Sequence, residues 1–175
     1  MSYQFIQVGT GGRGETWCRA LLQPAIEAGL VEPVAAVDVA PEKLANAREH
    51  LGLPKSACYT DTETAFAEHD ADFATCVVPP EFHEDVVDAA IDADLHVLSE
   101  KPIAGTFDAS IRIAEKMDRA GLKMGLTMNH RFNRHNTTFR EFVRGDEPGP
   151  LDFLAFRFAN DQRYRGDAGG GDSDF

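Results

Sequence analysis

Short apolar runs alternate with longer amphipathic stretches over residues 1–128 of the chain. The apolar runs predict β-strands over 3–8, 33–37, 57–59, 72–78, 95–98 and 123–128. Between them, apolar residues at helical spacing predict helices over 13–28, 41–50, 62–68, 81–93 and 107–120. Strands that alternate with helices indicate βαβ units, so the predicted fold class is α/β, with a doubly wound parallel sheet.

The pattern changes after Met128. A polar-rich helix is predicted over 132–143, and a long aromatic strand follows over 151–160, ahead of a glycine-rich end. One strand has no partner against which to bury its apolar face. We therefore expect residues 1–125 to form a complete domain and 126–175 to form the beginning of an incomplete α+β domain.

A G-x-G-x-x-G pattern follows the first predicted strand and opens the first helix. Its residues are Gly9, Gly11, Gly12, Arg13 and Gly14. A strand before it, a helix after it and an acidic residue at the end of the next strand are the context in which this pattern binds a dinucleotide. The alternative is a structural glycine turn. The pattern favours dinucleotide binding and a Rossmann-type domain.

Asp38 supplies the acidic residue, because it directly follows the strand predicted over 33–37. Its carboxylate is expected to accept hydrogen bonds from the adenosine ribose and to repel a 2′-phosphate, so the predicted cofactor is NAD, with NADP less favoured. The nearest base is Lys43, in the following helix. The alternative role of Asp38 is a helix cap.

Glu100, Lys101 and Pro102 follow the apolar strand predicted over 95–98. Proline ends a strand because it has no N–H to donate. A lysine at the carboxyl end of a strand in an open α/β sheet faces the ligand crevice, where it can transfer a proton. The alternative is an ordinary surface tripeptide. Only together with the glycine motif upstream does the tripeptide indicate a catalytic role.

Composition narrows the classes of protein further. The chain has 175 residues, of which 43% are hydrophobic, and a formal net charge of −12. This charge disfavours nucleic acid and anionic membranes as partners and resembles that of halophilic proteins. The 3 cysteines are widely spaced and predict neither a zinc site nor a disulfide framework. With no signal peptide and no apolar run of membrane-spanning length, we expect a cytoplasmic protein without a metal site.

Together these motifs resemble those of the Gfo/Idh/MocA oxidoreductases. The resemblance rests on the glycine motif, Asp38, the segment 78–83, the Glu-Lys-Pro tripeptide and the segment 129–132, in this order. It implies a Rossmann domain followed by a domain with a largely antiparallel sheet. It also implies NAD(P)-dependent oxidation or reduction of a sugar, polyol or related alcohol, and a homo-oligomer formed through the sheet domain of a full-length form.

The resemblance also assigns roles to residues. Lys101 would contact the reacting hydroxyl and assist proton transfer, and Pro102 would shape the nicotinamide pocket beside Glu100. Pro79 and His83 would lie on a loop beside the cofactor, although a histidine in a first helical turn also often bonds only to nearby backbone. Separately, His130 and Arg131 follow the sixth predicted strand, where they either contact substrate or form a solvated turn.

The chain departs from the family pattern after its glycine-rich stretch. The family has an aspartate there and, a few residues later, a histidine, whereas this chain has Asp172 and Asp174 and then stops at Phe175. Neither aspartate is assigned a catalytic role. The expected protein is a truncated oxidoreductase. The alternatives are a non-catalytic dinucleotide-binding module or subunit, and a different Rossmann reductase acting on amino-acid precursors, against which the Glu-Lys-Pro tripeptide argues.

Overall fold

The structure is a computed structural model that describes residues 2–145, 149–150, 153 and 155. The chain divides into two compact units, Met1–Thr127 and Met128–Phe175.

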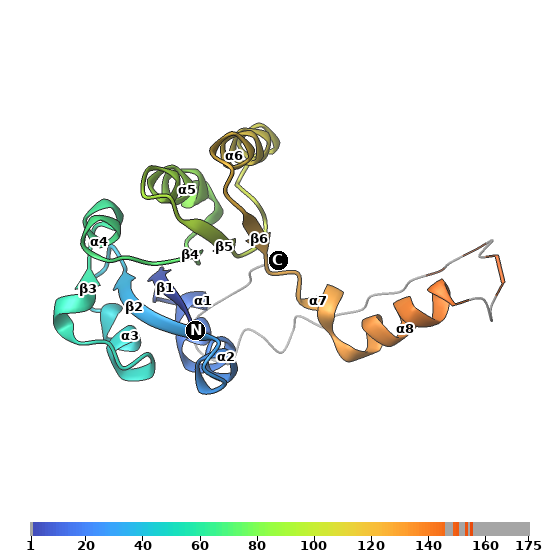
Figure 1. Ribbon diagram of the computed structural model, residues 1–175, viewed down its shortest axis with the longest axis horizontal. Helices are drawn as coiled ribbons and strands as arrows, with labels where there is room; N and C mark the ends of the chain where they lie inside the picture. The colour runs from blue at the N-terminus through green and yellow to red at the C-terminus, as the bar shows by residue number, and fades with distance from the viewer. Residues whose placement is uncertain (1, 146–148, 151–152, 154, 156–175) are drawn as a thin grey trace, which may run out of the picture. The chain divides into compact units, whose positions relative to one another are not determined.

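A single parallel sheet forms the centre of the first unit (Figure 1). Its strands are β1 (Tyr3–Val8), β2 (Val31–Val37), β3 (Cys58–Tyr59), β4 (Phe73–Cys76), β5 (His96–Ser99) and β6 (Met124–Leu126). They lie in the order β3-β2-β1-β4-β5-β6, and every neighbouring pair is parallel. The chain reverses its direction of winding between β1 and β4, and ligands bind at such a point, beyond the carboxyl ends of the strands. The predicted doubly wound α/β fold is confirmed.

Helices cover both faces of the sheet (Figure 1). One face carries α1 (Arg13–Thr16), α2 (Gln23–Glu27) and α3 (Leu44–His50), and the other carries α4 (Thr62–Glu68), α5 (His83–Asp92) and α6 (Phe107–Ala120). Each face has its own apolar cluster. Phe5, Trp17 and Leu44 belong to the cluster under α1–α3, and Ile6 and Ile113 belong to the one under α4–α6. Because β1 contributes to both clusters, it is buried on both faces, as expected of a central parallel strand.

The first predicted helix is interrupted. A π-helical turn (Trp17–Leu21) separates α1 from α2, and the N–H of Leu22 bonds to the carbonyl of Trp17 at 3.0 Å. Pro24 explains this interruption of the helix. Its nitrogen has no N–H to donate to the carbonyl four residues earlier, and its ring crowds that carbonyl. The side chain of Gln23 donates to the carbonyl of Cys18 at 2.6 Å and compensates part of this loss.

Pro33 lies inside β2, although proline has no N–H to donate to the hydrogen bonds of the sheet. The register of β1 against β2 shifts between Phe5 and Ile6, opposite this proline. A bulge of this kind accommodates a residue that cannot complete the ladder. The ladder thus continues on both sides of Pro33, and the strand begins at Val31, ahead of the predicted start at residue 33.

The ends of α6 are as the sequence predicts. The hydroxyl of Thr106 accepts a hydrogen bond from the N–H of Ala109 at 3.2 Å, and the helix ends at Gly121, whose φ is 70°. A left-handed residue after the last turn is a position where glycine costs least. The loop after β5 therefore ends at a capped helix, because Thr106 holds the first turn of α6.

The second unit contains α7 (Asn129–Phe132) and α8 (Arg134–Arg144). The helix predicted over 132–143 corresponds to α8, which begins at Arg134 because Asn133 is extended and its side chain accepts from the N–H of Asn136 at 2.8 Å. The short helix α7 was not predicted. The strand predicted over 151–160 and the glycine-rich end lie outside the described residues, apart from Phe153 and Ala155.

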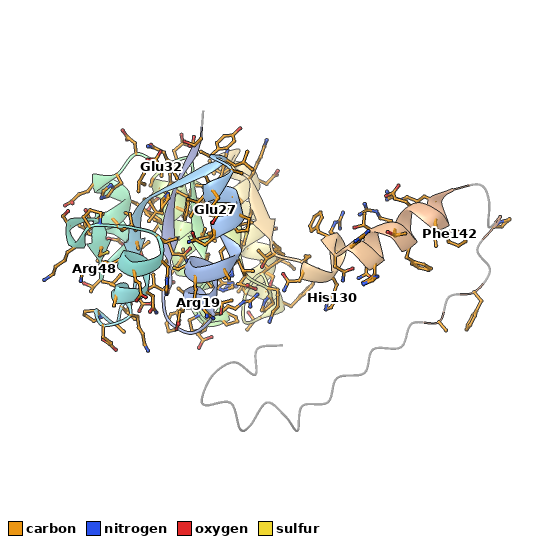
Figure 2. All side chains as sticks on the ribbon, turned by 90° about the horizontal axis from the view of Figure 1, so that it is seen from below. Arg19, Glu27, Glu32, Arg48, His130 and Phe142 are labelled. Carbon is orange, nitrogen blue, oxygen red and sulfur yellow. The ribbon has the colours of Figure 1, made fainter. Side chains whose placement is uncertain are left out.

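Charged side chains cover the outside of the first unit, as Figure 2 shows for Arg19, Glu27, Glu32 and Arg48. Within the described part of the chain, none of the helices has both the length and the apolar character that crossing a membrane requires.

Candidate functional site

The glycine loop after β1 is tightly packed against its neighbours. Gly9 has a φ of 86°, and its N–H donates to the carbonyl of Val37 at 2.8 Å. A Cβ atom on Gly9 would collide with the carbonyl of Val77, and one on Gly14 would collide with the carbonyl of Gly9. Both positions therefore require glycine for reasons of folding, before any ligand is considered.

Two fully buried polar side chains support this loop from within the sheet. The amide of Gln7 donates to the carbonyl of Gly9 at 2.7 Å, and the hydroxyl of Thr75 donates to the amide oxygen of Gln7 at 2.8 Å. Sequence reasoning missed this pair. The available signal was a glutamine inside a buried strand, since such a residue is retained only with hydrogen-bond partners.

Asp38 lies directly against the glycine loop. One carboxylate oxygen accepts from the N–H of Thr10 at 2.8 Å, from the N–H of Gly11 at 3.0 Å and from the hydroxyl of Thr10 at 3.1 Å. The other accepts from the N–H of Ala40 at 3.0 Å. Asn46, which the sequence did not reveal, donates to the carbonyl of Thr10 at 2.8 Å. Asp38 thus orders the glycine loop.

Gly11 differs from Gly9 and Gly14. The three atoms nearest to a Cβ on Gly11 all belong to the side chain of Lys43, the closest at 3.2 Å, and no backbone atom is among them. The exposed lysine is flexible and can move aside. Folding therefore does not demand glycine at this position, whereas close approach of a diphosphate to the backbone does. The residues present fit a dinucleotide.

Glu100 is buried at the end of β5 and faces the first helix. Its carboxylate accepts from Nε1 of Trp17 at 2.8 Å, from Nε of Arg13 at 2.9 Å and from the N–H of Lys101 at 3.3 Å. Burial raises the pKa of the Glu100 carboxyl, but hydrogen bonds from Trp17 and Arg13 outweigh it and hold the pKa below its usual range. Glu100 is therefore an ionised anchor between β5 and α1.

Lys101 follows this anchor and is half-buried, and its bond to the exposed Pro102 is cis. Pro79, also exposed, comes just before the 3₁₀ turn Pro80–Phe82 that leads into α5. His83 is fully buried at the start of α5. These residues follow β4 and β5, whose carboxyl ends lie at the same edge of the sheet as those of β1 and β2.

The structure thus gathers at one sheet edge most of the residues predicted for the site: the glycine loop, Asp38, the Pro79–His83 loop and Glu100 to Pro102. His130 and Arg131 lie on α7, in the second unit, so their role toward substrate stays a prediction. Among the residues that the structure describes, no three or more His, Cys, Asp or Glu side chains are grouped to hold a metal ion.

Two hollows lie away from the glycine loop. One, of about 280 Å³, lies between α6 and β6 and is lined mainly by apolar side chains such as Ile113, Met117 and Leu126. The other, of about 410 Å³, lies at the amino ends of the strands and includes Tyr3 and His96. We place the candidate site at the glycine loop because the dinucleotide pattern and the lysine are there.

A family model described as the oxidoreductase family with an NAD-binding Rossmann fold, GFO_IDH_MocA, matches residues 4–130. The chain belongs to the Gfo/Idh/MocA oxidoreductase family. It is 45% identical over 163 residues to the protein y4oX of Sinorhizobium fredii, covering 93% of this chain and 45% of that protein. It is 32% identical over 125 residues to an inositol 2-dehydrogenase of Corynebacterium glutamicum, covering 70% of this chain and 34% of that enzyme.

Solved structures show the same fold. The scyllo-inositol dehydrogenase of Lactobacillus casei with bound NAD(H) and scyllo-inositol superposes with a TM-score of 0.75 at 25% identity, covering 85% of this chain and 43% of that one. The chain spans less than half the length of these relatives. Family members carry an NAD-binding Rossmann fold, and this chain has that fold.

Proposed function

We propose that the protein is an NAD-dependent oxidoreductase that acts on a sugar, a polyol or a related alcohol. The observation that carries this proposal is the position of Lys101 at the carboxyl end of β5, on a loop that Glu100 ties to the helix of the glycine motif. A proton-transferring side chain is thereby held at the same sheet edge as a dinucleotide cradle.

Different residues of the chain would bind the cofactor and transfer the proton. The glycine loop and Arg13 would hold the diphosphate, and Asp38 would hold the adenosine ribose. Pro79 and Pro102 would flank the nicotinamide. When bound, the cofactor accepts or returns a hydride at C4 of nicotinamide. As the hydride leaves the alcohol carbon, Lys101 would take up the hydroxyl proton and pass it to solvent, which balances the oxidation to a carbonyl.

The relatives support the substrate class. Inositol 2-dehydrogenase and scyllo-inositol dehydrogenase are named for cyclic polyols, and the latter structure contains scyllo-inositol and NAD(H). Because this chain spans less than half of each relative, the activity is proposed for the whole protein, and the substrate-facing part is expected to lie largely beyond residues 1–127. The proposal also includes a cytoplasmic location and assembly into a homo-oligomer through the sheet domain of a full-length form.

The test combines binding with turnover. We expect the 175-residue chain to bind NADH in a fluorescence titration. It should oxidise a panel of sugars and polyols poorly, because positioning of the substrate can supply about 7–11 kcal/mol of the reduction in barrier. A longer form that includes a substrate domain should turn over at least one of them, and Lys101→Ala should lower that rate by about 10²–10⁴-fold. The absence of NADH binding, or an unchanged rate in Lys101→Ala, would contradict the proposal.

A non-catalytic dinucleotide-binding module is the second candidate. It is favoured by the placement of all proposed cofactor residues in the first unit, from which we expect the first unit to bind the cofactor by itself. The same experiment separates the two. NADH binding without turnover of any polyol or sugar by the longer form would favour the module.

A further inference from the structure

The loop that carries Lys101 is held on both sides of the lysine. On the near side, Glu100 bonds to Arg13, within the glycine motif, and to Trp17, just after it. On the far side, the carbonyl of Ile103 lies 3.1 Å from Nδ1 of His83. The first of these anchors is an ion pair reinforced by an indole. The second is a buried imidazole.

The His83 ring is enclosed by backbone. Its exposed fraction is 0%, and its Nε2 lies 2.9 Å from the carbonyl of Val78. The hydroxyl of Ser99 lies 3.5 Å from its Nδ1. Each ring nitrogen thus faces a carbonyl, one from the loop after β4 and one from the loop after β5. A neutral imidazole carries one N–H, so the ring donates to one of these carbonyls while its other nitrogen packs against the second.

The loop after β4 is in turn fixed against the glycine loop. The N–H of Val77 donates to the carbonyl of Val8 at 2.9 Å. The side chain of Val78 lies 3.2 Å from the place of a Cβ on Gly9, and the carbonyl of Val77 is closer still. The backbone of Val77 thus packs against Gly9, the carbonyl of Val78 lies against His83, and His83 lies against Ile103, two residues after Lys101.

We propose that His83 is a positioning residue, which sets the place of Lys101 and Pro102 relative to the glycine loop and does not itself contact the cofactor. This inference rests on the proposed function. It gives His83 a role different from the cofactor contact that the family resemblance implies, because its fully buried ring already lies against carbonyls of two loops. A second tie, from the N–H of Gly105 to the carbonyl of Pro80 at 3.1 Å, joins the same two loops.

A positioning role of His83 predicts a change in binding that a purely structural role would not produce. The glycine loop and Asp38 hold the adenosine diphosphate half of the cofactor, and the two bridged loops flank the nicotinamide half. Loss of the bridge should therefore weaken only the nicotinamide contribution to binding. ADP-ribose, which lacks nicotinamide, is the probe for the first half, and NADH is the probe for both.

Two variants break the bridge from opposite sides. In His83→Gln the side-chain amide can occupy the place of Nε2 and keep the contact with Val78, and in His83→Asn it can occupy the place of Nδ1 and keep the contact with Ile103. His96→Gln is the matched control, because His96 is exposed on β5 and its Nδ1 accepts from the N–H of Lys123 at 3.2 Å. Dissociation constants for NADH and ADP-ribose are measured by titration, together with the rise in nicotinamide fluorescence and the melting temperature.

We expect the unchanged chain and His96→Gln to bind NADH more tightly than ADP-ribose. Both His83 variants should bind ADP-ribose within about twofold of the unchanged chain and lose about fivefold or more in NADH affinity, as expected for a broken buried hydrogen bond. Their nicotinamide fluorescence should rise less on binding.

Three results would overturn the positioning role while leaving dinucleotide binding in place. They are equal affinity of the unchanged chain for the two ligands, an unchanged NADH affinity in both variants, and loss of ADP-ribose binding in both, which would make His83 a residue of the general fold. If the unchanged chain bound neither ligand, the proposed function itself would fail, and this inference with it.

Discussion

The carboxylate of Glu100 accepts a 2.8 Å hydrogen bond from the indole N–H of Trp17, which lies in the π-helical turn after α1. The exposed fraction of the Glu100 side chain is 8% and that of its other partner, Arg13, is 33%. A buried carboxylate is stable only when charge and hydrogen bonds compensate its desolvation. The acid of the Glu-Lys-Pro tripeptide therefore joins the carboxyl end of β5 to the first helix.

Removing this anchor should destabilise the first unit. Glu100→Gln removes the charge beside Arg13, and we expect it to lower the free energy of unfolding by about 1–3 kcal/mol. Trp17→Phe removes the indole donor and replaces a buried two-ring side chain with a smaller one, so it should cost about 1–3 kcal/mol. Glu15→Gln, at an exposed position in the same helix, is the control and should change stability by less than about 0.5 kcal/mol. Urea unfolding followed by circular dichroism measures all three, and equal midpoints for Glu100→Gln and Glu15→Gln would contradict the anchor.

The glycines of the loop should separate folding from binding. A Cβ on Gly14 meets the carbonyl of Gly9, so Gly14→Ala should destabilise the protein by about 1–3 kcal/mol or more. Gly11→Ala meets only the flexible side chain of Lys43 among its three nearest atoms, so its melting temperature should stay close to that of the unchanged chain. Its NADH affinity should nevertheless fall, because the added methyl group holds the diphosphate away from the backbone. Normal NADH binding by a folded Gly11→Ala variant would place the diphosphate elsewhere.

The sequence was sufficient to predict the order of strands and helices, because each apolar run and each cap is a local pattern. Thr106 and Gly121 are examples, since each acts within its own turn. The bonds of Glu100 and His83 were not predictable, because each depends on residues that are distant in sequence and meet only at the sheet edge. The interruption of the first predicted helix had a visible cause in Pro24, but the sequence did not indicate that the break would take the form of a π-helical turn over Trp17–Leu21.

Asp38 should govern the choice of cofactor. Asp38→Ala removes the acceptor for the N–H groups of Thr10 and Gly11 and the charge that disfavours a 2′-phosphate. We expect NADH affinity to fall by about tenfold or more and the preference for NADH over NADPH to narrow. Asp38→Asn keeps one oxygen acceptor and should show a smaller loss. Fluorescence titration with both nucleotides is the measurement, and tighter binding of NADPH than of NADH to the unchanged chain would refute the expected preference.

An ion-pair cluster between α5 and α6 should give stability that depends on pH. Glu84 bonds to Arg112 at 2.6 Å and to Lys116 at 3.0 Å, and these hydrogen bonds lower the pKa of Glu84 from 4.5 to about 2. A carboxyl whose pKa is lower in the folded state stabilises the fold above its unfolded pKa and loses that contribution as the pH falls toward the folded value. Stability should therefore decline between pH 4.5 and about 2. Glu84→Gln should make the decline shallower in acid unfolding curves, and curves that coincide after subtraction of a constant offset would exclude this contribution.

Salt should stabilise the protein. The net charge is −12, and exposed carboxylates such as Glu27 and Glu49 add to a repulsion that the folded state concentrates. Salt screens this repulsion over about 10 Å at 0.1 M and about 3 Å at 1 M, and it weakens exposed ion pairs such as Arg112 with Glu84 over the same range.

Because acidic residues outnumber basic ones 29 to 17, relief of repulsion should prevail, and a halophilic surface should keep gaining stability at molar salt. We expect the melting temperature to rise between about 0.2 and 2 M KCl, a range that extends past the salt concentration at which screening is nearly complete. The double variant Glu27→Gln with Glu49→Gln should rise less over the same range. A flat or falling melting temperature in the unchanged chain would instead indicate an ordinary acidic protein whose ion pairs outweigh its net charge.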